Sequence, residues 1–241
     1  MSLHNHANDG AQIGADDMTT ITLTINARAL KAAAICASTE ETRFYLNGVN
    51  IETDAAGHTL TATDGHRLIA LHHAHPEAAA ECPSFILPLH MIAKLKIGKR
   101  APDFATVTYD DGKLALSFDG LTIAGEAIQG TFPATRRVAY GAFHNEDAGK
   151  PASFNPAYIG DFGKIAEVLT GTKPKAIQII TNGDSPALVD FIGSKDASGV
   201  EGFGILMPCR MADSELLGPM PAWYRPEGYV APESPAAAVA A

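Results

Sequence analysis

The stretch TATDGHRLIALHH, residues 61–73, places several chemically versatile side chains at a break in a β-strand pattern. Polar and apolar residues alternate on both sides of the break, which is typical of strands with one buried face. Asp64-Gly65 is a turn signal, and His66-Arg67 follow it directly. A histidine and an arginine at the start of a strand could serve catalysis, metal binding, nucleic-acid contact or recognition of another protein.

The histidines of this region raise the possibility of a metal site: they are His66, His72, His73 and His75. On a strand, positions 73 and 75 share one face and position 72 lies on the other. No HExxH motif and no C-x-x-C pair accompanies them. The pattern therefore favours exposed histidines at a strand end, and we expect neither a metal nor another cofactor.

Hydrolysis is a second possibility, because Asp64 and His66 could act as an orienting acid and a general base. That chemistry also needs a serine or cysteine nucleophile, and the sequence contains no G-x-S-x-G motif. The Asp-Gly pair fits a turn former better.

Apolar Leu68 beside Arg67 instead suggests the wall of a binding pocket. An arginine can pack its aliphatic chain against such a wall while its guanidinium makes several hydrogen bonds. We therefore expect a binding protein and not an enzyme.

The composition predicts a globular protein. Apolar residues make up 46% of the 241 residues, which is enough for a sizeable core. The net charge of −9 argues against a surface devoted to phosphate but permits a local basic face. Cys36, Cys82 and Cys209 are too scattered for a disulfide framework or zinc ribbon, so a reducing cytoplasmic location fits best.

The two ends of the sequence lack the periodicity of the body. Residues 1–18 are polar and do not resemble a secretory signal, so we expect a flexible leader. Residues 212–241 are rich in proline and alanine and predict a mostly extended tail. The cluster Trp223-Tyr224 in this segment could dock on the body.

Between these ends, one order of elements recurs three times: strand, helix and three strands. The first copy comprises a strand over 21–25, a helix over 27–38 after the N-cap Asn26, and strands over 43–52, 58–64 and 66–73. The second comprises a strand over 84–88, a helix over 89–97, and strands over 105–110, 113–119 and 121–128. The third comprises a strand over 152–154, a helix after Asn155 that runs from Pro156 to about Leu169 and is ended by Gly171, and strands over 176–181, 187–193 and 203–208.

Five stretches resemble the bacterial DNA sliding clamp, the beta subunit of DNA polymerase III: RFYLNGVNIE, ATDGHRL, GTFPATRRV, SFNPAYIGDF and ILMPCRM. The resemblance runs from about Ile21 to Met211. It implies an α+β DNA-clamp fold, in which repeated β-α-β-β-β units carry their helices on one face of antiparallel sheets. Residues 19–140 would form a complete domain resembling the family's middle domain, and residues 150–211 half a domain resembling the second half of its C-terminal domain.

The resemblance also implies a hydrophobic pocket for short linear motifs of polymerases and clamp-loader-type proteins. One wall would consist of Leu46, Thr63, Gly65, His66, Arg67 and Leu68. The other would consist of Tyr158, Ile205, Met207, Pro208, Cys209, Arg210 and Met211. The sequence departs from the family at Tyr140, which replaces a proline, at Cys209, which replaces a methionine, and beyond Met211, where the family chain ends.

Non-specific contact with duplex DNA is the third implication, and it concerns basic residues on or near the first two helices. The candidates are Arg28, Lys31, Lys94, Lys96, Lys99 and Arg100. A solvated helix face would carry similar charges.

These observations define three hypotheses. The first is a DNA replication or repair accessory protein that binds linear motifs and could tether the proteins that carry these motifs to DNA. Its unmatched third unit predicts a homodimer or higher oligomer. The second is a regulator or decoy that occupies such motifs without encircling DNA. The third is a His-dependent metal enzyme centred on His66.

Overall fold

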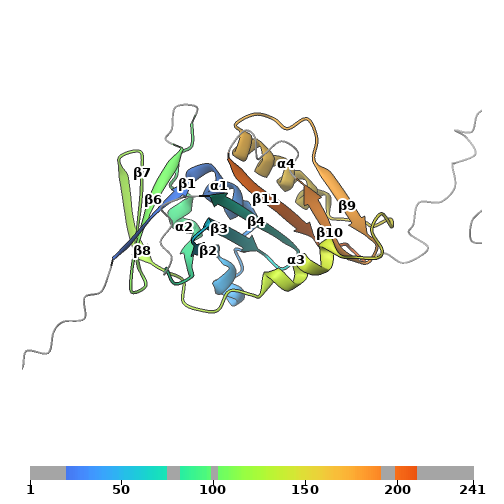
Figure 1. Ribbon diagram of the computed structural model, residues 1–241, viewed down its shortest axis with the longest axis horizontal. Helices are drawn as coiled ribbons and strands as arrows, with labels where there is room; N and C mark the ends of the chain where they lie inside the picture. Colours follow the sequence, from blue (N-terminus) through green and yellow to red (C-terminus); the bar gives the residue numbers. More distant parts are fainter. Residues whose placement is uncertain (1–19, 75–81, 99–102, 191–198, 211–241) are drawn as a thin grey trace, which may run out of the picture.

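The computed structural model describes residues 20–74, 82–98, 103–190 and 199–210 (Figure 1). Its strands form two antiparallel sheets. One has the order β1-β6-β7-β8, made of β1 (Ile21–Asn26), β6 (Phe104–Asp110), β7 (Lys113–Phe118) and β8 (Leu121–Glu126). The other has the order β5-β2-β3-β4-β11-β10-β9, made of β5 (Phe85–Pro88), β2 (Gly48–Asp54), β3 (Gly57–Thr63), β4 (Arg67–Ala74), β11 (Val200–Leu206), β10 (Ser185–Asp190) and β9 (Gln178–Asn182).

The seven-stranded sheet joins segments that lie far apart in the sequence. Strand β4 pairs with β11 along its length, from His73 opposite Val200 to Arg67 opposite Leu206. The strands of the first repeat and those of the third are thus hydrogen-bonded into one surface, which Figure 1 shows as adjacent teal and orange arrows.

Two helices cover one face of this sheet. Helix α1 (Ala27–Ala33) begins where the Asn26 side chain accepts a hydrogen bond from the Ala29 N–H, at 2.9 Å. Helix α4 (Pro156–Thr170) begins at Asn155, which accepts from the Ala157 N–H, and it ends at Gly171 in the left-handed conformation. Both N-cap predictions are confirmed. The two helices pack against each other, and Phe162 and Leu30 are fully buried between them and the sheet.

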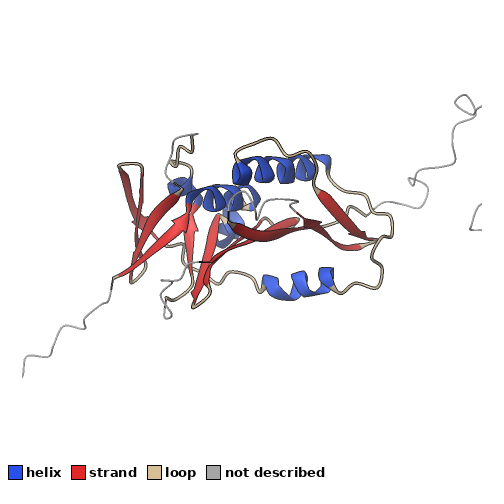
Figure 2. Ribbon diagram, turned by 45° about the horizontal axis from the view of Figure 1, so that its top comes forward, coloured by secondary structure: helices blue, strands red, loops and turns tan. Residues whose placement is uncertain are grey.

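Helix α3 (Thr135–Phe143) lies on the opposite face of the same sheet, as Figure 2 shows. The sequence analysis assigned no helix to this stretch. Ala139 and Ala142 are buried against β10 and the neighbouring strands, and the ring of Phe143 meets the ring of Phe203 edge-on at 5.0 Å. Tertiary packing therefore stabilises a helix whose sequence is short and contains Gly141.

Three further element predictions need correction. The residues predicted as the start of a strand at 43 form a 3₁₀-helix, Glu41–Leu46, and β2 begins only at Gly48. Helix α2 is a single turn, Leu89–Ile92, and not a helix over 89–97. The strand predicted over 152–154 is reduced to one bridge between Ser153 and Cys209. The division into one complete and one half domain stays a prediction.

Candidate functional site

The turn between β3 and β4 is fixed by hydrogen bonds of its own side chains. Asp64 Oδ1 accepts from the backbone N–H groups of His66 at 2.9 Å and Arg67 at 3.0 Å. Thr63 Oγ1 donates to the Arg67 carbonyl at 2.7 Å and accepts from the Gly65 N–H. Gly65 has a φ of +91°, where a Cβ would be strained. Asp64 is therefore a turn former, as its Asp-Gly context predicts.

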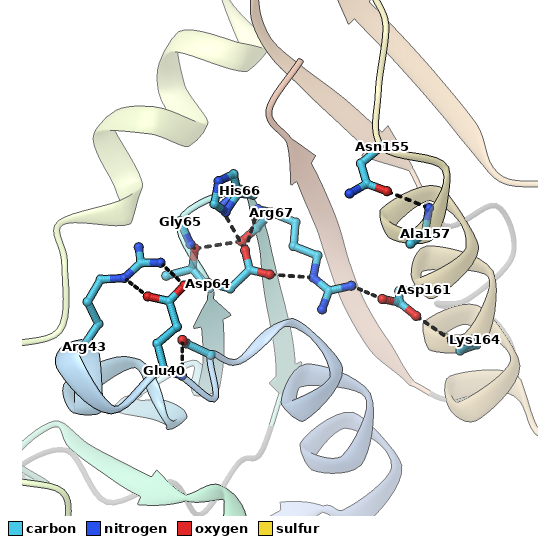
Figure 3. Close-up of polar contacts among 12 residues, drawn as sticks. Glu40, Arg43, Asp64, Gly65, His66, Arg67, Asn155, Ala157, Asp161 and Lys164 are labelled. Atoms are coloured by element: carbon cyan, nitrogen blue, oxygen red, sulfur yellow. Dashed lines mark hydrogen bonds and ion pairs between the residues drawn. The ribbon is translucent and has the colours of Figure 1, made fainter. Parts of the chain in front are cut away.

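Arg67 connects this turn to helix α4, as Figure 3 shows. Its Nε donates to Asp64 Oδ2 at 3.1 Å, and its Nη1 donates to Asp161 Oδ2. Its guanidinium carbon lies 4.7 Å from the centroid of the Tyr158 ring. The Arg67 side chain is only 11% exposed. The guanidinium is thus shared between the turn and α4, and its stem remains available as part of a pocket wall.

Charge pairing also fixes the ionisation of Asp161. Partial burial would by itself raise the pKa of this carboxyl. The hydrogen bonds from Lys164, at 2.7 Å, and from Arg67 outweigh that effect and hold the pKa of Asp161 below its ordinary value.

Burial raises the pKa of the nearby Cys36 thiol to about 12, so this cysteine stays protonated at neutral pH and is no nucleophile.

A cavity of about 390 Å³ opens beside the turn, between the end of β11 and the start of α3. It brings together seven of the predicted pocket residues: Leu46, Thr63, Gly65, Arg67, Leu68, Ile205 and Met207. Met207 is 37% exposed, which makes it an accessible apolar side chain at the rim. Residues far apart in the sequence therefore form one mostly apolar concavity.

The sequence analysis missed the other residues that line this cavity: Arg43, Tyr45, Pro133, Ala134, Thr135, Val138 and Pro186. Four of them lie just before α3 or in its first turn. The apolar residues Val138, Ala139, Ala142 and Phe143 have helical spacing, and this signal could have revealed the helix and with it the missing wall.

Several predicted pocket residues lie outside the lining. His66 is exposed, and its ring is 6.0 Å from that of Tyr158, which itself packs on Arg67. Pro208, Cys209 and Arg210 follow β11 beyond the cavity, and the Cys209 N–H donates to the Ser153 carbonyl at 2.7 Å. Met211 lies outside the described residues.

The basic residues predicted to face DNA fall into three groups. Arg28 donates to the carbonyls of Val168 and Gly98, and Lys31 donates to those of Ile92 and Ala93, each at 3.4 Å. Lys94 and Lys96 are exposed after α2. Lys99 and Arg100 lie outside the described residues.

The histidines have ordinary environments where the structure describes them. The His72 ring is 3.3 Å from Thr59 Oγ1, and the His73 ring packs near Phe104 at 5.3 Å between centroids. His75 lies outside the described residues. Within residues 20–74, 82–98, 103–190 and 199–210, no group of three His, Cys, Asp or Glu side chains is placed to hold a metal ion. Among the described helices, none combines the length and apolarity that crossing a bilayer requires.

Residues 20–134 match the family model described as DNA polymerase III beta subunit, central domain. The matched range is 115 of the 241 residues, just under half of the chain. The beta sliding clamp of Caulobacter vibrioides (strain NA1000 / CB15N) is 35% identical over 106 residues, which is 42% of this chain. That match spans only 28% of the relative's length. The resemblance seen in the sequence motifs is thereby confirmed.

Solved structures extend the similarity of fold beyond the family match. A DNA polymerase sliding clamp from Caulobacter crescentus has a TM-score of 0.58 and 21% identity, covering 84% of this chain and 69% of that chain. The clamp of Bartonella birtlesii bound to griselimycin has a TM-score of 0.60 and 18% identity, covering 79% of this chain and 66% of that chain. The predicted α+β clamp fold is confirmed.

The Arg67–Asp161 contact generates a prediction about pH-dependent stability. Asp161→Asn should lower the free energy of unfolding at pH 7 by about 1–3 kcal/mol, because hydrogen bonds to a charged group have roughly that value. The folded pKa of Asp161 lies below the unfolded value of about 3.9, so its contribution is fully present above that pH. The difference between wild type and variant should therefore shrink as the pH falls from about 4 through the folded pKa.

Urea unfolding at pH 7 and at several values below pH 4 measures this difference. Glu167→Gln, an exposed acidic position on the same helix, serves as the control. A difference between wild type and Asp161→Asn that stays constant across the series would contradict the ion-pair explanation.

Proposed function

We propose that this protein is a sliding-clamp-like accessory protein of DNA replication or repair, which binds short linear motifs in the cavity beside Arg67 and Met207. Its partners would be polymerases or clamp-loader-type proteins, and its role is binding and not catalysis. The observation that carries the proposal is the cavity itself, since its walls come from the β3–β4 turn, the end of β11 and the start of α3.

The chemistry of these walls suits a peptide with an apolar anchor. Leu46, Leu68 and Ile205 supply rigid aliphatic surface, and the flexible thioether of Met207 adapts to different side chains. Burial of one leucine or phenylalanine side chain here would stabilise a complex by roughly 1.5–3 kcal/mol. The Bartonella birtlesii clamp binds griselimycin, so at least one relative of this fold accommodates a ligand.

A second candidate function is a regulator that occupies clamp-binding motifs without encircling DNA. The contacts of Arg28 and Lys31 favour it, because both side chains donate to backbone carbonyls of neighbouring segments. Cations used in this way are less available to a phosphate backbone. Lys94 and Lys96 are then the described basic residues best placed for DNA.

Self-association is part of the proposal. In the described residues, β9 is the last strand of the seven-stranded sheet and β8 the last strand of the other. An open strand edge presents unpaired backbone groups that a second copy can satisfy. We expect two chains to pair along β9 about a two-fold axis. Sedimentation velocity over a range of concentrations should show a dimer; a monomer at every concentration would contradict this arrangement.

Peptide binding is tested by titrating a fluorescently labelled clamp-binding pentapeptide that contains Gln and a Leu/Phe pair. Met207→Ala should weaken binding by about 1 kcal/mol, or roughly five-fold, because it removes apolar surface at the rim. Leu121→Ala is the matched control, since Leu121 is a similarly exposed apolar residue on the other sheet and should leave the affinity unchanged. Equal affinities in wild type and Met207→Ala would show that the peptide does not use this cavity.

Duplex DNA binding separates the two candidate functions. A protein that tethers its partners to DNA should bind duplex DNA without sequence preference and lose affinity steeply with salt. The double variant Lys94→Glu/Lys96→Glu should then reduce the slope of log K against log salt by roughly two units. Fluorescence anisotropy across a salt series measures both quantities. Absence of salt-dependent binding by wild type would support the regulator instead.

A further inference from the structure

A second and larger cavity, of about 530 Å³, lies on the face of the seven-stranded sheet that carries α3. Its floor includes Ala70 of β4, Leu188 of β10 and Phe203 of β11, and one wall is formed by Ala139 and Phe143 of α3. Phe143 is 51% exposed although its ring contacts Phe203. We call this concavity the α3 groove. Figure 2 shows α3 on the face opposite to α1 and α4.

The α3 groove is separate from the cavity proposed to bind linear motifs. The two concavities share only Leu68 and Thr135 among the described residues that line them. Helix α3 divides them, with Ala139 and Phe143 facing the groove and Val138 facing the other cavity. An occupant of the groove would therefore leave the surface around Met207 accessible.

Acidic side chains predominate at the rim of the groove. Glu52, Asp190 and Glu201 contribute carboxylates, and the one arginine of the lining, Arg136, is paired with Glu52. An apolar floor that includes the ring of Phe203, together with an acidic rim, suits a segment that carries an aromatic side chain next to a cation.

The same chain contains such a segment. Residues 222–225 read Ala-Trp-Tyr-Arg and include the single tryptophan of the sequence. Strand β11 carries Phe203 in the floor of the groove, and the described chain continues to Arg210, at most ~25 Å of extended backbone further on. From Arg210 to Trp223 an extended chain spans up to ~45 Å, so the segment can return to the groove.

We propose that residues 222–225 dock in the α3 groove of their own chain. Trp223 packs on Phe143 and Phe203, and Arg225 faces the carboxylate of Asp190. The covalent connection gives the segment a high effective concentration, so modest contacts are sufficient for docking. The docked segment would also hold α3 against the sheet, because it covers the exposed part of Phe143.

The single tryptophan makes the experiment specific. In the full chain under native conditions, the fluorescence emission should be shifted to shorter wavelength than in the urea-unfolded chain, and acrylamide should quench it less. Phe143→Ser should move the emission toward that of the unfolded chain, because it removes the wall of the groove. Arg225→Glu should do the same without altering the folded body, and Arg225→Lys should retain the wild-type emission.

Val138→Ser is the matched control, since it replaces an exposed apolar residue on the other side of the same helix. It should leave the tryptophan emission unchanged while it weakens binding of the labelled pentapeptide. Circular dichroism of each variant verifies that the fold is intact.

Three outcomes would overturn the proposal. Wild-type emission equal to that of the unfolded chain would show that the segment is not docked. An emission shift caused by Val138→Ser and not by Phe143→Ser would place the tryptophan in the other cavity. Emission that shifts with protein concentration would show that the segment docks on a second copy. Each outcome is distinct from failure of peptide binding, which the pentapeptide titration measures separately.

Discussion

The pairing of β4 with β11 is the constraint on which the site depends. It aligns Arg67 opposite Leu206, so the turn before β4 and the end of β11 emerge at the same edge of the sheet. Met207 then follows directly, and its N–H donates to the His66 carbonyl at 2.8 Å. This register places the turn at residues 63–67 next to an exposed methionine, and both contribute to the lining of one cavity. A shift by one residue would turn the side chains of β11 to the other face.

Arg67 secures this arrangement by joining the β3–β4 turn to helix α4. Its carboxylate partners come from the turn and from α4, and its guanidinium also packs on Tyr158. Because these groups are mostly buried, loss of either carboxylate would leave a charge without its partner, which costs more than the net contribution of the pair. Arg67 thus has a structural role, and the binding role proposed for its aliphatic chain depends on it. The polar groups of the turn are satisfied by hydrogen bonds within the turn, and the cavity beside it is lined mostly by apolar residues.

The sequence predicted the parts of the structure that depend on local chemistry. Rules that operate over a few residues predicted the turn at Asp64, the N-caps Asn26 and Asn155, and the end of α4 at Gly171. The resemblance to sliding clamps identified Leu46, Leu68, Ile205 and Met207, all of which line the cavity. Long-range packing was not predictable in this way. The partner of Arg67 on α4 is 94 positions away, and α3 forms because the sheet offers a surface on which Ala139 and Ala142 are buried. Because α3 was not predicted, the wall of the cavity that contains Val138 was missed as well.

The central claim is that one cavity, built across the β4–β11 pairing, receives a peptide anchor. The most direct test is photo-cross-linking with a pentapeptide whose aromatic anchor is p-benzoylphenylalanine, followed by mass spectrometry of the adducts. The account predicts adducts on Met207 and on Val138 from the same peptide, since both line the cavity from different elements. Adducts confined to a different surface, with neither residue modified, would contradict it.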